Sequence, residues 1–254
     1  MSNDQKQPFL SHLEELRKRL VVCAIGVGVG FVICYIFSEH LFRVLVVPLK
    51  EVLPEGDKLI FTNLPEMFFT YLKVAFIGGI LIATPLIFYE LWMFIAPGLY
   101  QKEKKYLIPF VVSSTILFMG GSLFGYFIVF PFGFKFFIGF SNEYVKALPS
   151  VKQYFSFSTK LLFAFGLVFE LPVFMFFLSK MGVVTPEFLK KKRKYAILLS
   201  FVVSAILTPP DVITQVMMAG PLIILYEIGI LVAKLASKKS EKGEEAEETE
   251  TPTG

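Results

Sequence analysis

Long stretches without charge divide this chain, and they limit what it can fold into more than any other feature. Residues 20–38, for example, lie without a single charge between Arg19 and Glu39. About 20 apolar residues are needed to cross the roughly 30 Å of hydrocarbon in a bilayer as an α-helix. A helix also satisfies its backbone N–H and C=O groups internally, which a membrane requires. The sequence therefore predicts an all-α integral membrane protein.

Charged residues at the ends of the apolar runs define six predicted transmembrane helices. Glu170 interrupts the fourth run and Glu227 the sixth. An even number of spans places both termini on one side of the membrane. The acidic segment 237–254 lacks apolar periodicity, so we expect a disordered cytoplasmic tail after a transmembrane domain of residues 1–236. The predicted spans are 20–38, 67–95, a stretch within 106–134, 161–179, 195–208 and 212–233.

The distribution of lysine and arginine predicts on which side of the membrane the two termini lie. The two termini and the loops at 96–106 and 180–195 together hold 17 of the 25 basic residues. Excess Lys and Arg in short loops marks the cytoplasmic side of a membrane protein. Both termini are therefore predicted to be cytoplasmic.

The fifth predicted helix is short. From Tyr195 to Thr208 it has 14 residues, or about 21 Å at 1.5 Å per residue, and the sequence TPPD, which closes with Asp211, ends it. Helix six follows after almost no loop, so we expect a short hairpin of helices five and six. Such a hairpin thins the bilayer or lies beside a wet cavity. The alternative is a tilted neighbour and a misplaced boundary.

Prolines inside the spans predict kinks, because each removes an N–H and frees the carbonyl four residues earlier. Pro85, Pro172 and Pro221 fall in helices two, four and six. Kinked helices favour a concave, cup-like wall over a straight bundle. In the outer loop 38–67 we expect a short amphipathic helix and, at Pro48, a turn.

The residue types needed for catalysis are missing from the predicted spans. The two histidines, His12 and His40, lie at opposite ends of helix one, and no aspartate lies inside a span. No metalloprotease or phosphate-loop motif occurs, and the two cysteines fit no metal or redox pattern. We therefore predict that the protein is not an enzyme and holds no metal or cofactor. Transport or reception remains.

Carboxylates in or near the membrane are the best functional clue. Glu170 lies at midspan, where an ionisable group usually faces the bundle interior or a wet cavity. Glu90 and Glu227 lie near cytoplasmic helix ends, where snorkelling or a lysine partner explains them. On chemistry alone, Glu15 and Glu103 pair with neighbouring lysines.

Four motifs together resemble one family. They are HLEELRKRL before the first span, FIAPGLYQKEKK after the second, FGLVFELP in the fourth and KKKRKYAILLSFVVSAILTPPDVITQ through the fifth. In this order, from about residue 8 to 235, they resemble TatC, the receptor subunit of the twin-arginine protein translocase. One departure is Glu90, where the family often has glutamine.

The resemblance implies a function and a set of residues. The family binds folded precursors whose signal peptides carry two consecutive arginines, and it assembles with single-span TatA/TatB-type subunits in the bacterial cytoplasmic (inner) membrane. It implies homo- and hetero-oligomers and contact with membrane lipid, but no nucleic acid. Glu15 and Glu103 match the acids that bind the arginine pair. The other residues that match family positions are Arg17, Phe94 and Pro48, with Arg17 and Phe94 near the signal-binding site, and Glu170, Thr208 and Gln215 in an intramembrane polar groove that contacts partners. We expect Phe94 to pack the loop after helix two onto that helix. Structural positions predicted from the residues themselves are Pro85, Pro172, Pro221 and Asp211, beside Pro48.

Two other functions stay open on the residues alone. A proton- or ion-coupled small-solute transporter would use Glu170 as a relay, and it predicts inverted repeats and several polar residues at midplane. We find no convincing repeat and one midplane acid. A passive scaffold would bind no ligand at Glu15 or Glu103.

Overall fold

The computed structural model describes residues 6–95, 107–208 and 212–249, and the side-chain environments of 11–95, 107–208 and 212–235. Within these ranges the chain is helical apart from one isolated bridge between Ile60 and Ser150. It forms two compact units, Met1–Met119 with Tyr126–Lys160, and Gly120–Gly125 with Leu161–Gly254. Each unit is described by itself.

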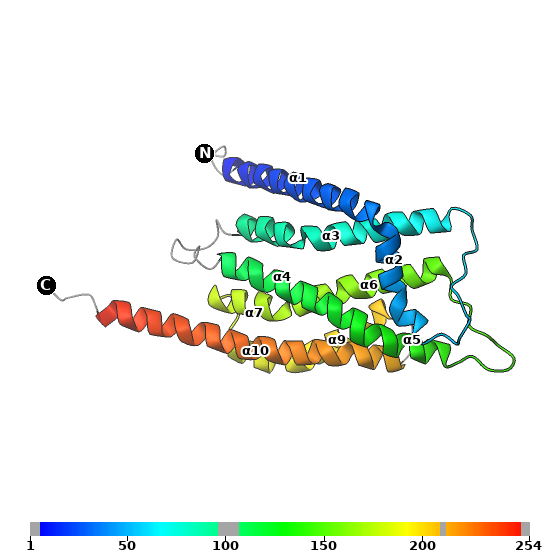
Figure 1. The fold of residues 1–254 in the computed structure, drawn as a ribbon. Coiled ribbons are helices and arrows are strands. Elements are labelled where there is room, and N and C mark those ends of the chain that lie inside the picture. The colour runs from blue at the N-terminus through cyan, green and yellow to red at the C-terminus, as the bar shows by residue number, and fades with distance from the viewer. Residues whose placement is uncertain (1–5, 96–106, 209–211, 250–254) are drawn as a thin grey trace. The chain divides into compact units, whose positions relative to one another are not determined.

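The first unit is built around α1 (Lys6–Ile36) and α3 (Glu66–Ile95), which lie side by side (Figure 1). Their backbones meet at Gly30 and Gly79, where a Cβ on Gly30 would lie 2.7 Å from the Gly79 carbonyl oxygen. Only glycine permits this approach, and small residues at such crossings are typical of membrane helix pairs. Trp92 of α3 stacks on Phe110 of the next helix with ring centroids 4.8 Å apart.

A third span-length stretch, Leu107–Ile138, consists of three helical segments in sequence. They are α4 (Leu107–Phe124), the π-helical turn η3 (Gly125–Val129) and α5 (Phe130–Ile138). The π-turn ends two residues before Pro131, which has no N–H to donate. We did not predict this turn, because Pro131 lies at the edge of the predicted span.

The amphipathic helix expected in the outer loop is confirmed as α2 (Ser38–Lys50), which packs against α3 and α5 (Figure 1). The interpretation of Pro48 as a turn of the loop is wrong. Pro48 lies inside the last turns of α2 and is buried beside Leu49. The physical reason is that hydroxyl donors from other helices replace the bond that proline removes: Tyr126 donates to the Val44 carbonyl and Tyr154 to that of Leu45.

The second unit contains the end of α6 (Val151–Phe169), α7 (Leu171–Lys180), α8 (Pro186–Lys191), α9 (Arg193–Leu207) and α10 (Val212–Thr249). α10 packs against α7, α8 and α9. The short α8 was not predicted, although Thr185 caps it by accepting a hydrogen bond from the Phe188 N–H at 3.2 Å.

Five helical stretches are long and apolar enough to cross a membrane, so the predicted all-α membrane fold is confirmed. α9 is short, as expected: its 15 residues span about 22 Å. A count of six spans and a cup-like wall stay predictions. Helix six is not short, because Val212–Leu235 alone has 24 residues. The TPPD sequence ends α9, and nothing comparable follows within α10.

The predicted proline kinks have different outcomes along the chain. Helix four is interrupted between Phe169 and Leu171, two residues before the proline ring at 172. Pro85 and Pro221 lie inside α3 and α10, which continue through them without a break in the helix. α10 also continues through 237–249, where the sequence predicts disorder, because Lys and Glu there are good helix formers that extend an existing helix.

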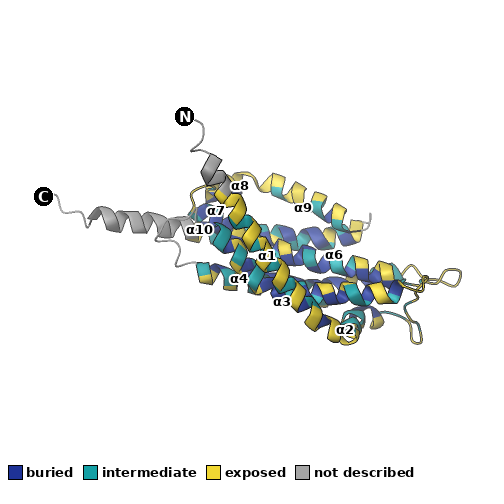
Figure 2. Cartoon of the chain, turned by 90° about the horizontal axis from the view of Figure 1, so that it is seen from above, coloured by how far each residue is buried: buried dark blue, intermediate teal, exposed yellow. Residues whose placement is uncertain are grey.

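Many large apolar residues of the helices are exposed. Figure 2 shows exposed positions in yellow along the helices. On α1, Ile25, Val29 and Val32 are each more than half exposed. Large apolar surfaces of this kind are rare on soluble monomers. They fit a helix that contacts lipid.

Candidate functional site

An arginine between two carboxylates joins α1 to α3 at the predicted cytoplasmic end of the first unit. Arg19 donates to Oε1 of Glu15 from Nε at 3.0 Å and from Nη2 at 2.5 Å. Its Nη1 donates to Oε2 of Glu90 at 2.9 Å. Glu15 lies one helical turn before Arg19, whereas Glu90 comes from the neighbouring α3.

The three side chains differ in exposure. The exposed fractions are 33% for Glu15, 19% for Arg19 and 13% for Glu90. Glu15 is therefore the acid that an incoming ligand reaches most easily. With both carboxylates ionised, two negative charges face one guanidinium, and the group retains a formal negative charge that attracts a further cation. Charge-assisted hydrogen bonds of this kind are stronger than neutral ones.

An aromatic contact lies beside this group. Phe94, one turn after Glu90 on α3, stacks on His12 of α1 with ring centroids 4.3 Å apart and planes 18° apart. Phe94 thereby joins α3 to α1, whereas its predicted packing against the loop after helix two involves residues outside the described ranges and stays a prediction. Arg17 is exposed on α1.

Two predicted residues lie outside the described residues. Glu103, the second acid expected to bind the arginine pair, falls in 96–106, and Asp211 falls in 209–211. The pairing of Glu15 with Glu103 therefore stays a prediction.

Glu170 occupies the interruption between α6 and α7. Its backbone N–H donates to the Leu167 carbonyl at 3.1 Å, and its carbonyl accepts from the Phe174 N–H at 2.9 Å. Its side chain is partly buried in the second unit. The backbone N–H and carbonyl of Glu170 are thus both bonded at the interruption, and a groove around Glu170 stays a prediction.

Thr208 and Gln215 both bond to the backbone of α9. Thr208 closes a series of three hydroxyls, each bonded to the carbonyl four residues earlier; its own bond to the Ser204 carbonyl is 2.8 Å long. Nε2 of Gln215 donates to the Phe201 carbonyl at 3.1 Å and so ties α10 to α9. Gln215 therefore holds the hairpin of α9 and α10 together, and contact of either residue with a partner is untested.

Each of the two acids near cytoplasmic helix ends has a basic partner, but the partner is not the lysine that the sequence predicts. Arg193 contacts Glu227 at 2.6 Å, and Arg19 contacts Glu90. Arginine rather than lysine supplies both contacts, which fits its planar, multidentate geometry.

Sequence analysis missed two important residues, Arg19 and Glu66. The four-residue spacing of Glu15 and Arg19 on one helix was the available signal for the first. For Glu66 the signal was Asn63 three residues earlier, just before an apolar run, which is a capping pattern. Among the described residues, no group of three His, Cys, Asp or Glu side chains is placed to hold a metal ion.

Comparison with known proteins gives one consistent result. The family described as Sec-independent protein translocase protein (TatC) matches residues 11–221. The Sec-independent protein translocase protein TatC of Desulforapulum autotrophicum is 57% identical over 242 residues, covering 95% of this chain and 90% of that protein. The protein of the same name from Escherichia coli K12 is 40% identical over 245 residues, covering 96% and 95%.

A solved structure is also similar. The crystal structure of a twin arginine translocase receptor, TatC, superposes with a TM-score of 0.79 at 44% sequence identity. The match covers 89% of this chain and 99% of that one.

Proposed function

The chain belongs to the TatC family of Sec-independent protein translocase proteins, and from this we propose that it is the signal-peptide receptor of a twin-arginine translocase. The similar crystal structure is of a protein described as a twin arginine translocase receptor. All the relatives compared are protein translocase components, which favours protein transport over the small-solute alternative and over catalysis.

The observation that carries the proposal is the contact between Arg19 and Glu15. Glu15 already binds a guanidinium through two nitrogen atoms, so its position and partial exposure suit an arginine side chain. The Arg19 contact supports recognition of arginine rather than lysine, because only a guanidinium donates from two nitrogens in this geometry.

Recognition then proceeds by exchange. A signal arginine approaches Glu15, the most exposed of the three side chains, and replaces Arg19 there. Arg19 keeps its bond to Glu90, so its charge is not left unpaired in a region of low polarity. Glu103 provides the second acid for the second arginine of the signal.

Assembly with single-span subunits is assigned to the second unit. Glu170, Thr208 and Gln215 supply polar atoms within membrane-depth helices, where polar side chains hydrogen-bond across helices. The receptor lies in the bacterial cytoplasmic membrane with both termini in the cytoplasm. Folded precursors then bind on the side that carries α1's first turns.

The test is binding of a fluorescent twin-arginine signal peptide to the full chain in neutral detergent. Glu15→Gln should raise Kd by about 10- to 100-fold, since a charge-assisted bond contributes about 1.5–3 kcal/mol. Glu39→Gln is the matched control, because Glu39 forms the same i,i+4 pair with Arg43 at 2.5 Å on α2. The control should bind as the unaltered protein does.

A second peptide shows whether the contact is direct. With a signal whose arginines are replaced by glutamine, Glu15→Gln should weaken binding much less, because the bond is already lost. Equal weakening for both peptides would rule out direct contact between Glu15 and a signal arginine.

A further inference from the structure

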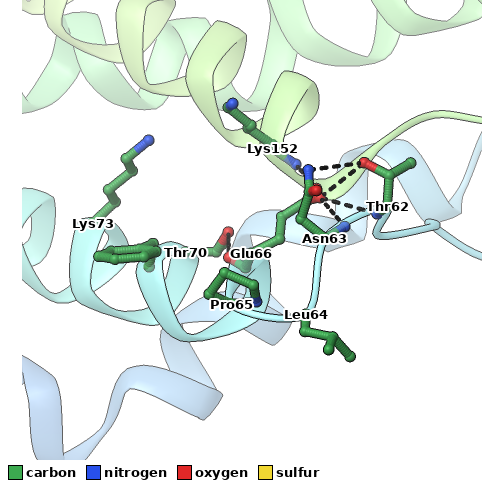
Figure 3. Close-up of a pocket in the computed structure, with 9 residues that line it drawn as sticks. Thr62, Asn63, Leu64, Pro65, Glu66, Thr70, Lys73 and Lys152 are labelled. Carbon is green, nitrogen blue, oxygen red and sulfur yellow. Dashed lines mark hydrogen bonds between the residues drawn. The ribbon is translucent and has the colours of Figure 1, made fainter.

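A pocket of about 690 Å³ opens at the end of the first unit opposite the Arg19 group, on the predicted outer side of the membrane. It lies where α3 and α6 both begin, beside the segment that leads into α3 (Figure 3). Its volume is in the range of small-molecule sites. Nothing in the proposed signal-binding function uses it. Its lining is Thr62, Asn63, Leu64, Pro65, Glu66, Phe69, Thr70, Lys73 and Lys152.

The floor of the pocket is a carboxylate whose charge is already satisfied. Glu66 is 5% exposed, and its Oε2 accepts from the backbone N–H groups of Thr62 and Asn63 at 3.0 and 3.3 Å. Its Oε1 accepts from the Lys152 N–H at 2.8 Å and the Ser150 hydroxyl at 3.1 Å. Glu66 therefore joins the two outer loops, and both of its oxygens already accept hydrogen bonds from within the chain.

Two lysines supply the positive charge of the pocket. Lys73 extends from α3 and Lys152 from α6, with their amino groups on the same side of the view in Figure 3. Both side chains are exposed, and neither forms an ion pair within the described part of the chain. The acid Asp57 does not neutralise either lysine, because it already pairs with Lys146 at 2.6 Å.

Lys73 lies at a depth in the predicted membrane span where an unpaired positive charge is unfavourable. Lys73 lies seven residues into α3, about 10 Å along the axis from Glu66. A lysine at membrane depth is costly unless it pairs with an opposite charge or reaches the interface. Lys73 and Lys152 on one pocket thus call for an anion from outside the chain.

We propose that the pocket lined by Lys73 and Lys152 binds a phosphate group, presented by a phospholipid headgroup or as free phosphate. Lysine is a common phosphate ligand, acting as a point charge. The pocket also has an apolar rim, since Leu64 is 92% and Phe69 55% exposed. Both side chains precede Lys73 in the chain and lie nearer the outer end of α3, and exposed apolar side chains at that depth suit the lipid interface, which fits a lipid source.

The experiment uses the full chain, purified in neutral detergent and examined by native mass spectrometry. Phosphatidylglycerol is titrated against a diacylglycerol with the same acyl chains and no phosphate. The double variant Lys73→Gln/Lys152→Gln should bind phosphatidylglycerol roughly 30-fold more weakly than the unaltered chain, from the loss of two lysines near the membrane surface. The matched control is Lys160→Gln, an exposed lysine of α6 outside the pocket.

A charge-preserving variant guards against a folding defect. Lys73→Arg/Lys152→Arg should restore most of the binding, and all variants should share one thermal unfolding midpoint without lipid. Inorganic phosphate then separates the sources: if it displaces phosphatidylglycerol from the unaltered chain, free phosphate also occupies the site, and otherwise the headgroup is the ligand. Unchanged lipid binding in the double variant, or equal binding of diacylglycerol, would overturn the proposal.

Discussion

The hydroxyl of Tyr126 donates a hydrogen bond of 2.6 Å to the backbone carbonyl of Val44. Val44 lies four residues before Pro48, which has no N–H to donate to that carbonyl within α2. The hydroxyl of Tyr154 donates to the next carbonyl, that of Leu45. Two tyrosines from other helices therefore stabilise α2 at the point where its own hydrogen bonding is interrupted.

The first prediction concerns this bond. Tyr126→Phe should lower the free energy of unfolding by about 1 kcal/mol, because it leaves the Val44 carbonyl without the donor that replaces the proline. Thermal or chemical unfolding of the full chain in detergent measures the loss. Tyr144→Phe is the control, since Tyr144 is 93% exposed in an outer loop and should change stability little.

A double variant shows that proline is the cause. In Pro48→Ala the residue at position 48 regains an N–H for Val44, so adding Tyr126→Phe should cost much less than it does in the unaltered chain. Equal cost in both backgrounds would mean that Tyr126 stabilises the protein by packing and not through Val44.

The second prediction concerns Glu66. Glu66→Ala should lower the unfolding free energy by about 3 kcal/mol, because it removes the acceptor for donors in both outer loops. Limited proteolysis should then cut the segments 51–65 and 139–150 faster. Glu55→Gln, an exposed change in the same loop, should alter neither measurement.

Glutamine at position 66 tests the geometry further. An amide keeps one acceptor oxygen but places an NH₂ group against the remaining donors. Glu66→Gln should therefore free one loop to proteolysis and leave the other protected. Protection of both loops would show that the negative charge and the second oxygen are dispensable.

The third prediction separates two roles for Arg19. If it competes with the signal for Glu15, Arg19→Gln should tighten binding of a twin-arginine peptide by about 5- to 10-fold, since it leaves Glu15 unpaired and the group more negative. Glu90→Gln should weaken binding, because Arg19 then has only Glu15 as partner. Arg43→Gln, which breaks the same kind of pair on α2, is the control.

Peptide titration of the three variants gives the answer. Opposite changes for Arg19→Gln and Glu90→Gln fit competition. If both variants weaken binding to a similar extent, Arg19 orients Glu15 and does not compete for it.

The fourth prediction concerns Glu170 at the interruption between α6 and α7. We expect a polar contact with the signal or a partner helix, so Glu170→Gln should retain most export of a twin-arginine reporter, whereas Glu170→Ala should lose most of it. Export is compared at matched protein abundance. Leu167→Ala, an exposed change one turn earlier, should export normally. Gln as inactive as Ala would favour a proton or charge role.

Accessibility of the same position can be measured directly. In a chain without Cys23 and Cys34, a water-soluble thiol reagent should label Glu170→Cys if the site lies in a wet groove. An absence of labelling from either side of the membrane would contradict the groove.

The fifth prediction concerns topology. Reporter fusions after residues 55, 145 and 240 should lie outside, outside and inside, because 17 of the 25 basic residues fall on the predicted cytoplasmic side. The measurement counts spans independently of helix length, and so decides whether the 15-residue α9 crosses the membrane. A reporter after residue 240 on the outside would contradict six spans.

Much of the fold could be predicted because membrane helices are specified locally. The apolar runs placed α3, α6 with α7, and α9 within a few residues of their observed ends, except that α6 begins ten residues before the predicted span. The π-turn before Pro131 and the continuous helix through Pro85 were not predictable in the same way. Whether a freed carbonyl finds a new partner depends on neighbouring helices, which sequence does not place.

Only part of the candidate site could be predicted, because contacts between residues far apart in sequence depend on how the helices pack. Glu15 was found from its motif, but its partner Glu90 is 75 residues further along the chain and meets it only through Arg19. Glu66 was missed because its two loops, at 62–63 and 150–152, are also far apart in sequence.

The sequence by itself determined that the chain is an integral membrane protein, that its spans are helical and which family it belongs to. Composition and short-range hydrogen bonding decide these properties, and both can be read along the chain. Only the tertiary structure decided that Arg19 bridges Glu15 and Glu90, that the Tyr126 hydroxyl donates a hydrogen bond to the Val44 carbonyl and that Lys73 and Lys152 line one pocket. These contacts depend on the rotation and depth of one helix against another, and hydropathy fixes neither, because many rotations bury equally apolar surfaces.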